Sequence, residues 1–299
     1  MTERQNKHLM QLVRRVHGLL ENDDLQKQRD SQNQLASILT NSKNFIFDGF
    51  DVNNLYFEWT DYCQRLKNNE NNDKIIFYCH GGGYMTGSCL YARELTTKLA
   101  KQTMRRVFCF DYRLAPEHPY PAALEDALAA WEYIISQGYS AENIIMAGDS
   151  AGGNLALALT LSLKDKALAL PRALVLFSPW TDMTLSSESY SLRGSVDPVL
   201  NTDYIKKAAE NYLNGSDCRL TMVSPLFADL SGFPPVYIQV GDNEILLGDS
   251  RKLYNKLLSD NVFAKLDVFS NMWHVFQMSP VKAAQTAISK VSDFIEDLG

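Results

Sequence analysis

The chain has 299 residues, of which 45% are hydrophobic and 21% are charged. This balance is typical of a folded globular protein and excludes a disordered chain, which would be poor in apolar residues. The net charge of −6 disfavours a nucleic-acid-binding protein, because such domains usually carry an excess of basic residues. No run of 18 or more apolar residues is present, so the sequence predicts no membrane-spanning helix.

The cysteines and residues 1–15 give information about the cellular compartment of the protein. The chain has five cysteines, which is an odd number, and no two of them form a C-x-x-C pair. Both facts disfavour a disulfide framework or a zinc cluster. Cys79 and Cys109 lie in apolar runs and are expected to be buried thiols. Residues 1–15 are polar and of mixed charge, without the apolar core of a signal peptide, so we expect a cytoplasmic protein.

The pattern of apolar residues divides the chain into helices and strands. Residues 1–42 are polar, and apolar residues at helical spacing over 9–20 predict an amphipathic helix, followed by a second helix over about 23–39. Short β-prone runs then appear at 45–50, 55–59, 75–79, 107–110, 144–147, 173–177, 236–240 and 264–269. Helical segments are predicted at 92–101, 122–136, 151–164, 203–213, 250–259 and about 280–298.

This alternation predicts an α/β fold with a mostly parallel, eight-stranded sheet and helices on both faces. The first two strands lack an intervening helix and could form an antiparallel pair. More than fifty residues separate the strand that ends near 178 from the one that starts near 235, and a structureless loop of that length is improbable. We therefore expect one domain over 1–299, with a helical cap formed by about 1–42 and 183–232. This cap would cover the C-terminal edge of the sheet, where open α/β sheets place their sites.

The strongest chemical pattern is G-x-S-x-G, which occurs as GDSAG at residues 148–152. A predicted strand precedes it and a predicted helix follows it, which is the context that a nucleophile elbow requires. The glycines permit a sharp turn, and the helix N-terminus points its free amides at developing negative charge. We therefore predict that Ser150 is a nucleophile. The alternative is a glycine-rich turn without chemistry.

A second motif, HGGG at residues 80–83, follows the predicted strand 75–79. Backbone without side chains can present adjacent N–H groups to one oxygen, and with the amide of Ala151 these would hold a tetrahedral oxyanion. The alternative, a phosphate-binding loop, lacks the Lys and Ser/Thr of a P-loop. His80 is expected to fix the loop through hydrogen bonds.

A nucleophilic serine needs a base with a pKa near neutrality, and the chain has five histidines. His274 is the candidate, because it follows the last predicted strand and completes the order nucleophile, acid, histidine. The acid is expected after the predicted strand 236–240, where Asp242 and Glu244 both qualify and the residues alone do not choose. Asp249 is a more distant candidate and is expected to be a helix N-cap.

With these residues in place, the chain resembles the hormone-sensitive lipase-like esterases, the bacterial family IV carboxylesterases of the α/β-hydrolase superfamily. The matching stretches follow family order and are 80–83, 111–123, 148–154, 178–182 and 274–276. The 111–123 stretch is highly specific, whereas the elbow alone is not. The resemblance implies an α/β-hydrolase fold with a helical cap, and oxyanion donors at Gly82, Gly83 and Ala151.

The resemblance also bears on the acid and the substrate. In many members the catalytic acid is the Asp of an Asp-Pro-Leu sequence, two residues before the Leu. Aligning that Leu with Leu246 puts Glu244 at the position of the acid and favours it over Asp242. The implied activity is that of a serine carboxylesterase acting on small-molecule esters with short-to-medium acyl chains. Its mechanism needs no metal or organic cofactor, and a homodimer is plausible by family analogy. An amidase or deacetylase on the same triad, and a ligand-binding member without turnover, are the alternatives.

Overall fold

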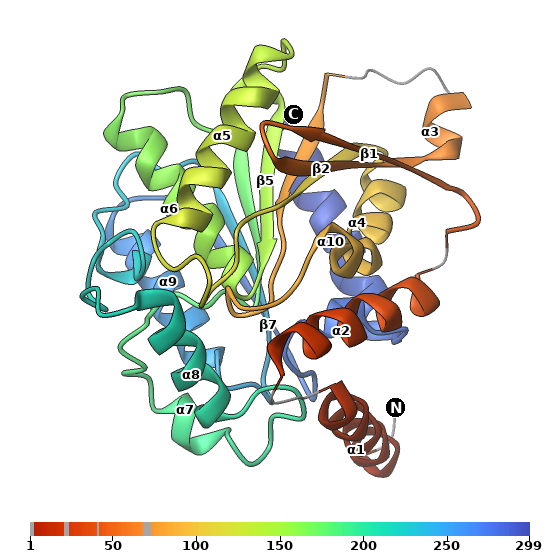
Figure 1. Ribbon diagram of the computed structural model, residues 1–299, viewed down its shortest axis with the longest axis vertical. Helices are drawn as coiled ribbons and strands as arrows, with labels where there is room; N and C mark the ends of the chain where they lie inside the picture. The colour runs from red at the N-terminus through yellow and green to blue at the C-terminus, as the bar shows by residue number, and fades with distance from the viewer. Residues whose placement is uncertain (1–2, 21–23, 41, 68–72) are drawn as a thin grey trace.

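The computed structural model describes residues 3–20, 24–40, 42–67 and 73–299 (Figure 1). The strands are β1 (Phe45–Val52), β2 (Leu55–Tyr62), β3 (Ile75–Cys79), β4 (Arg106–Asp111), β5 (Ile144–Asp149), β6 (Ala173–Phe177), β7 (Val236–Gly241) and β8 (Ala264–Phe269). The α-helices are α1 (Glu3–Leu20), α2 (Leu25–Leu39), α3 (Cys63–Lys67), α4 (Cys89–Thr103), α5 (Ala122–Ser136), α6 (Ala151–Asp165), α7 (Ser189–Leu192), α8 (Thr202–Leu213), α9 (Leu247–Ser259) and α10 (Lys282–Asp297). Every predicted strand and helix is present, whereas the short helices α3 and α7 were not predicted.

The strands form one eight-stranded sheet in the order β1-β2-β4-β3-β5-β6-β7-β8. The pairs from β4 through β8 are parallel, and β2 pairs antiparallel with both β1 and β4. The predicted fold class is therefore confirmed, including the antiparallel pair of the first two strands. Central strands that are buried on both faces explain the continuous apolar runs in the sequence.

Two hydrophobic cores lie on opposite faces of the sheet. Ile144 and Met146 of β5 belong to the core beneath α5, α6 and α9, whereas Ile145 and Ala147 belong to the core beneath α4 and α10. This alternation follows from the two-residue period of a β-strand. Figure 1 shows the two helical layers on either side of the sheet. Cys79 and Cys109 are buried, as predicted.

Several helices of the described chain lie outside these two layers. α1, α2, α7 and α8 gather at one end of the molecule, at the bottom of Figure 1. The long interval after β6 contains α7 and α8, together with a single 3-10 turn at Pro225–Phe227, so it is structured as expected. In the described ranges, no helix combines the length and the apolar character that crossing a membrane requires.

Candidate active site

Ser150 lies at the turn between β5 and α6 and has a positive φ of 54°. A non-glycine residue rarely adopts this conformation, so the surrounding structure must hold it in place. The Ser150 amide donates to the carbonyl of Phe177 (2.9 Å), and its carbonyl accepts from the amide of Trp180 (3.1 Å). These bonds anchor the turn to the end of the neighbouring strand β6 and to the residues that follow it.

The glycines on either side of the turn are required by close backbone packing. A Cβ atom on Gly148 would overlap the backbone carbonyl of Gly152. A Cβ atom on Gly152 would overlap the carbonyls of Cys79 and His80, at the end of β3. The G-x-S-x-G spacing therefore has a steric cause, since only glycine lets β5, α6 and the end of β3 approach this closely.

His274 lies in the loop after β8, and its Nδ1 is 2.9 Å from Oε2 of Glu244. Glu244 is fully buried, and its Oε1 accepts hydrogen bonds from the Ser178 hydroxyl (2.8 Å) and the Gly241 amide (2.5 Å). Burial opposes protonation of His274, but the hydrogen bond and the charge of Glu244 outweigh it and raise the pKa of the imidazole. The carboxylate is thus held through both oxygens while it orients the ring.

The other two candidate carboxylates have structural partners. Asp242 accepts a hydrogen bond from the amide of Asn271 (2.6 Å) and so ties the end of β7 to the loop after β8. Asp249 accepts from the amide of Thr181 (2.9 Å). The N-cap of α9 is Leu246, so the expectation that Asp249 caps a helix is wrong, because its carboxylate is turned toward another loop. Neither carboxylate has a hydrogen bond to the His274 ring in the described part of the chain.

The glycine loop after β3 is held by the buried carboxylate of Asp149, which accepts a hydrogen bond from the Gly81 amide (2.9 Å). Gly82 and Gly83 have positive φ values of 117° and 63°, which glycine adopts readily. Ala151 is the first residue of α6, so its amide is among those that helix geometry leaves without an intrahelical partner. Because Gly81 is already engaged, the amides of Gly82, Gly83 and Ala151 are the candidates for holding an oxyanion.

His80 is fully buried beside this loop. Its ring stacks on that of Tyr112 with the centroids 4.1 Å apart, and its Nδ1 lies 2.8 Å from the carbonyl oxygen of Gly81. Burial lowers the pKa of His80 and thereby favours the neutral ring. These contacts fit a role in fixing the loop.

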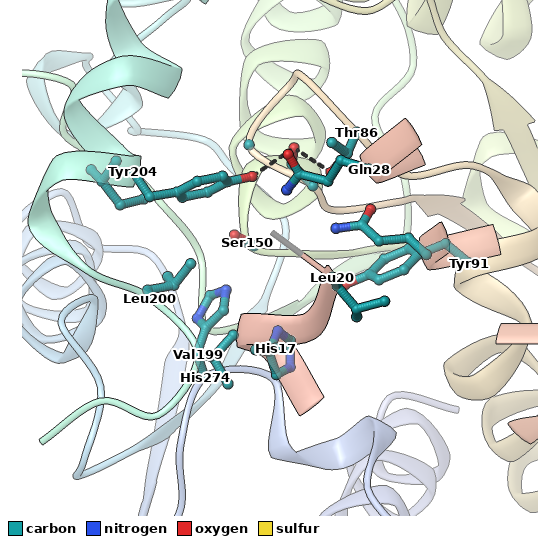
Figure 2. Close-up of a pocket in the computed structure, with 14 residues that line it drawn as sticks. His17, Leu20, Gln28, Thr86, Tyr91, Ser150, Val199, Leu200, Tyr204 and His274 are labelled. Atoms are coloured by element: carbon teal, nitrogen blue, oxygen red, sulfur yellow. Dashed lines mark hydrogen bonds between the residues drawn. The ribbon is translucent and has the colours of Figure 1, made fainter. Parts of the chain in front are cut away.

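Ser150 and His274 line the same cavity, which has a volume of about 80 Å³ (Figure 2). The N-terminal helices form part of its wall: α1 contributes His17 and Leu20, and α2 contributes Gln28. The sequence predicted that these helices would cover the site but did not predict which side chains reach it. For His17 and Gln28, a polar residue near the apolar positions of an amphipathic helix is the signal that could have found them; Leu20 carries no such signal.

The segment after β6 forms another part of the wall. Val199 and Leu200 lie just before α8, and Tyr204 and Ile205 lie in its first turn. The Tyr204 hydroxyl lies 3.5 Å from the carbonyl oxygen of Gly82, on the glycine loop (Figure 2). The cavity therefore lies between the edge of the sheet and helices from two distant parts of the sequence.

A mostly parallel sheet flanked by helices, with a serine at a strained strand-to-helix turn, is typical of the α/β hydrolases, and the comparisons agree. The family model described as alpha/beta hydrolase fold matches residues 76–278. An esterase of Acinetobacter venetianus is 37% identical over 241 residues, which cover 79% of this chain and 78% of that protein. An acetyl-hydrolase of Streptomyces hygroscopicus is 37% identical over 203 residues, which cover 68% of each.

Solved structures give the same assignment over the whole chain. The crystal structure of an esterase from the bacterial hormone-sensitive lipase family has a TM-score of 0.92 and 31% identity, and the match covers 100% of both chains. The chain belongs to the α/β-hydrolase family and, within it, to the hormone-sensitive lipase-like esterases, as the resemblance implied. It is a carboxylic ester hydrolase.

Proposed function

We propose that this esterase uses Ser150 as its nucleophile, His274 as its general base and Glu244 as the acid of a catalytic triad. The observation that carries the proposal is the hydrogen bond from His274 to the buried Glu244 carboxylate, in a cavity that Ser150 also lines (Figure 2). The carboxylate would keep the proton on Nδ1 and stabilise the imidazolium that forms when the serine is deprotonated. Nε2 is then the atom that accepts the serine proton.

The reaction would proceed through an acyl-enzyme. Ser150 Oγ attacks the ester carbonyl while Nε2 of His274 takes its proton, and the amides of Gly82, Gly83 and Ala151 bind the resulting oxyanion. His274 then gives this proton to the departing alcohol as the tetrahedral intermediate collapses. In the second half, His274 deprotonates a water that attacks the acyl-enzyme, and it returns the proton to Ser150 as the acid leaves.

We infer that the substrates are esters with short-to-medium acyl chains. The cavity of about 80 Å³ supports this, because its volume suits a small acyl group better than a long one. Leu20, Val199 and Leu200 supply apolar wall on which such a group can pack. The similarity to a protein named acetyl-hydrolase also supports a small acyl group.

The test is hydrolysis of p-nitrophenyl acetate, butyrate and decanoate by the wild type, Ser150→Ala and Ser162→Ala. Ser162 is a matched control, because it is also a buried serine and lies in α6, away from the cavity lining. We expect Ser150→Ala to lose about 10⁴- to 10⁶-fold in kcat while Ser162→Ala stays within threefold of the wild type. Butyrate and acetate should be turned over faster than decanoate.

Covalent labelling tests the acyl-enzyme route separately. A sulfonyl fluoride that modifies active-site serines should add one adduct to the wild type and none to Ser150→Ala, as measured by intact mass. Full activity in Ser150→Ala would overturn the assignment of the nucleophile. Turnover of p-nitroanilide amides faster than of the matching esters would favour the amidase alternative, and ester binding without turnover would favour a ligand-binding member.

We also infer that the protein is a single domain whose cap comprises about 1–42 and 183–232. The cavity wall formed by α1, α2 and α8 supports this. Within the proposed cap, residues 1–2, 21–23 and 41 lie outside the described residues. The homodimer and the cytoplasmic location stay predictions, to be tested by mass measurement in solution and by cell fractionation.

A further inference from the structure

Asp197 connects the cavity wall to the loop that carries Glu244. It lies between α7 and α8 and is only 4% exposed. Its Oδ1 accepts hydrogen bonds from the amides of Val199 (2.9 Å) and Leu200 (3.0 Å), and its Oδ2 accepts one from the amide of Ile245 (3.0 Å). One buried carboxylate therefore holds backbone from two segments that are far apart in the sequence.

Both segments belong to the site. Val199 and Leu200 line the cavity, and the Ile245 amide belongs to the peptide group that follows Glu244. A hydrogen bond to that amide restrains the backbone on the C-terminal side of Glu244, while the Gly241 amide and the Ser178 hydroxyl hold its side chain.

The N-terminal helix is attached at the same place. Arg14 of α1 donates to the backbone carbonyls of Ser195 (2.9 Å), Val196 (3.2 Å) and Asp197 (3.2 Å). The guanidinium thus contacts three successive carbonyls of the segment whose next residues form the cavity wall. α1, the segment before α8 and the loop of Glu244 therefore meet at Asp197.

The charge of Asp197 also acts on His274. Desolvation raises the pKa of Asp197 to about 6, and its negative charge in turn raises the pKa of the imidazole. Glu244 and Asp149 act on His274 in the same direction, whereas a charged imidazole at His17 and one at His274 would repel each other. Removal of the Asp197 charge should therefore make His274 easier to deprotonate in the free enzyme and its imidazolium less stable during the reaction.

We propose that Asp197 is a positioning residue that holds the loop of the catalytic acid against the substrate-facing segment before α8 and supports the charge on His274. This inference rests on the proposed triad. Among the described residues, Asp197 is not part of the cavity lining, and its side chain accepts hydrogen bonds from the amides of Val199, Leu200 and Ile245. It acts by holding the backbone amide of Ile245 on one side and those of Val199 and Leu200 on the other.

The test compares Asp197→Asn with Asp249→Asn. Asp249 is a matched control, because it is a fully buried aspartate whose Oδ2 accepts from two backbone amides, those of Thr181 (2.9 Å) and Asp182 (3.1 Å). For each variant, kcat and KM for p-nitrophenyl acetate and the pH profile of kcat/KM are measured. Folding is checked by circular dichroism and thermal melting.

In Asp197→Asn, an amide NH₂ replaces one oxygen, so the side chain can no longer accept from both segments. We expect kcat to fall about tenfold, KM to rise several-fold, and the acid limb of kcat/KM to move to lower pH by about half a unit. Asp197→Glu keeps the charge but displaces it, so its acid limb should stay near that of the wild type while kcat falls. Asp249→Asn should lower the melting temperature and leave the acid limb in place.

The proposal is overturned if Asp197→Asn matches the wild type in kcat and in its acid limb, or if Asp249→Asn produces the same shift. It is also overturned if Asp197→Asn and Asp197→Glu both fail to fold, because Asp197 then has a purely structural role. Failure of the triad is detected separately, since Ser150→Ala would then keep its activity and the wild type would not be labelled by the sulfonyl fluoride.

Discussion

His274 and Glu244 are 30 residues apart in the chain, yet their side chains are joined by a 2.9 Å hydrogen bond in a buried site. The bond exists because β7 and β8 are adjacent parallel strands, so the loops that follow them emerge at the same edge of the sheet. Glu244 follows β7 and His274 follows β8. The parallel register therefore brings the predicted acid and the predicted base together.

The first prediction separates the two carboxylates that the sequence left open. Glu244→Gln should lower kcat by about 10²- to 10⁴-fold, because an amide at this position neither stabilises the imidazolium nor fixes the correct tautomer. Asp242→Asn, the same chemical change two residues away, should stay within about threefold of the wild type. The measurement is steady-state hydrolysis of p-nitrophenyl butyrate by both variants. A larger loss in Asp242→Asn than in Glu244→Gln would reverse the assignment.

The second prediction concerns the glycine loop. In Gly82→Ala the new Cβ atom would overlap the backbone carbonyl of Thr86, so the loop must shift and its amides lose their alignment. We expect kcat to fall about 100-fold, as for loss of an oxyanion donor. Gly232→Ala is the control, because Gly232 also has a positive φ (78°) but a Cβ atom there meets open space.

Gly232→Ala should be destabilised by about 1–2 kcal/mol, because alanine is strained at positive φ. Gly82→Ala should be destabilised by more than this, because its Cβ atom also overlaps the Thr86 carbonyl. Only Gly82→Ala should lose catalytic activity in the fraction of the protein that remains folded. Thermal melting and kcat measured on the same preparations separate the two contributions. Equal activity losses in the two variants would indicate that the oxyanion assignment to this loop is wrong.

The third prediction concerns how α2 is attached to the site. Arg29 donates to the carbonyls of Met85 (2.8 Å) and Ala115 (3.0 Å) and binds both carboxylate oxygens of Glu117 (2.8 and 2.7 Å). Met85 lies two residues after Gly83, so the guanidinium links α2 to the chain just beyond the glycine loop. Arg29→Met keeps much of the aliphatic chain and removes these bonds.

We expect Arg29→Met to raise KM several-fold and to lower the free energy of unfolding by about 2 kcal/mol, since hydrogen bonds to a charged group contribute this much. Lys27→Met is the control on the same helix, because the Lys27 side chain is 70% exposed and its ion pair with Asp24 lies at the surface. Steady-state kinetics and thermal melting provide the readouts. Equal changes in KM for the two variants would contradict a specific role for Arg29.

The fourth prediction is a pH dependence of stability that arises from His17. Burial in the cavity wall, together with the charge of His274, lowers the pKa of His17 to about 4, whereas in the unfolded chain it is about 6.5. Between these values the unfolded state binds the proton and the folded state does not, so this group costs stability as pH falls from 6.5 to 4. Above pH 6.5 the group makes no such contribution.

The variant His17→Leu lacks the imidazole, so it does not have this loss of stability at acidic pH. When the pH falls from 7 to 4.5, the free energy of unfolding should therefore decrease by about 2 kcal/mol more in the wild type than in His17→Leu. Chemical denaturation at several pH values measures it. The comparison also removes the contributions of the acidic groups, which both proteins share. A difference that is constant across this range would contradict a lowered pKa of the half-buried His17.

The sequence by itself determined the sheet, its flanking helices and the motifs. Strand and helix periods, together with the glycines around Ser150, are local properties of the chain, and each is visible within a dozen residues. The predicted order of Ser150, acid and His274 along the chain is likewise a linear pattern. These features therefore required no knowledge of long-range contacts.

Only the tertiary structure decided between Asp242 and Glu244 as the hydrogen-bond partner of His274. Two carboxylates that are two residues apart have the same local pattern. They differ in their partners, because Glu244 faces the His274 ring and Asp242 faces the Asn271 amide. Asp197 was likewise not predicted, because its three amide partners lie on segments that the fold alone brings together. A side chain's direction depends on contacts across the fold, and periodicity along the chain does not encode them.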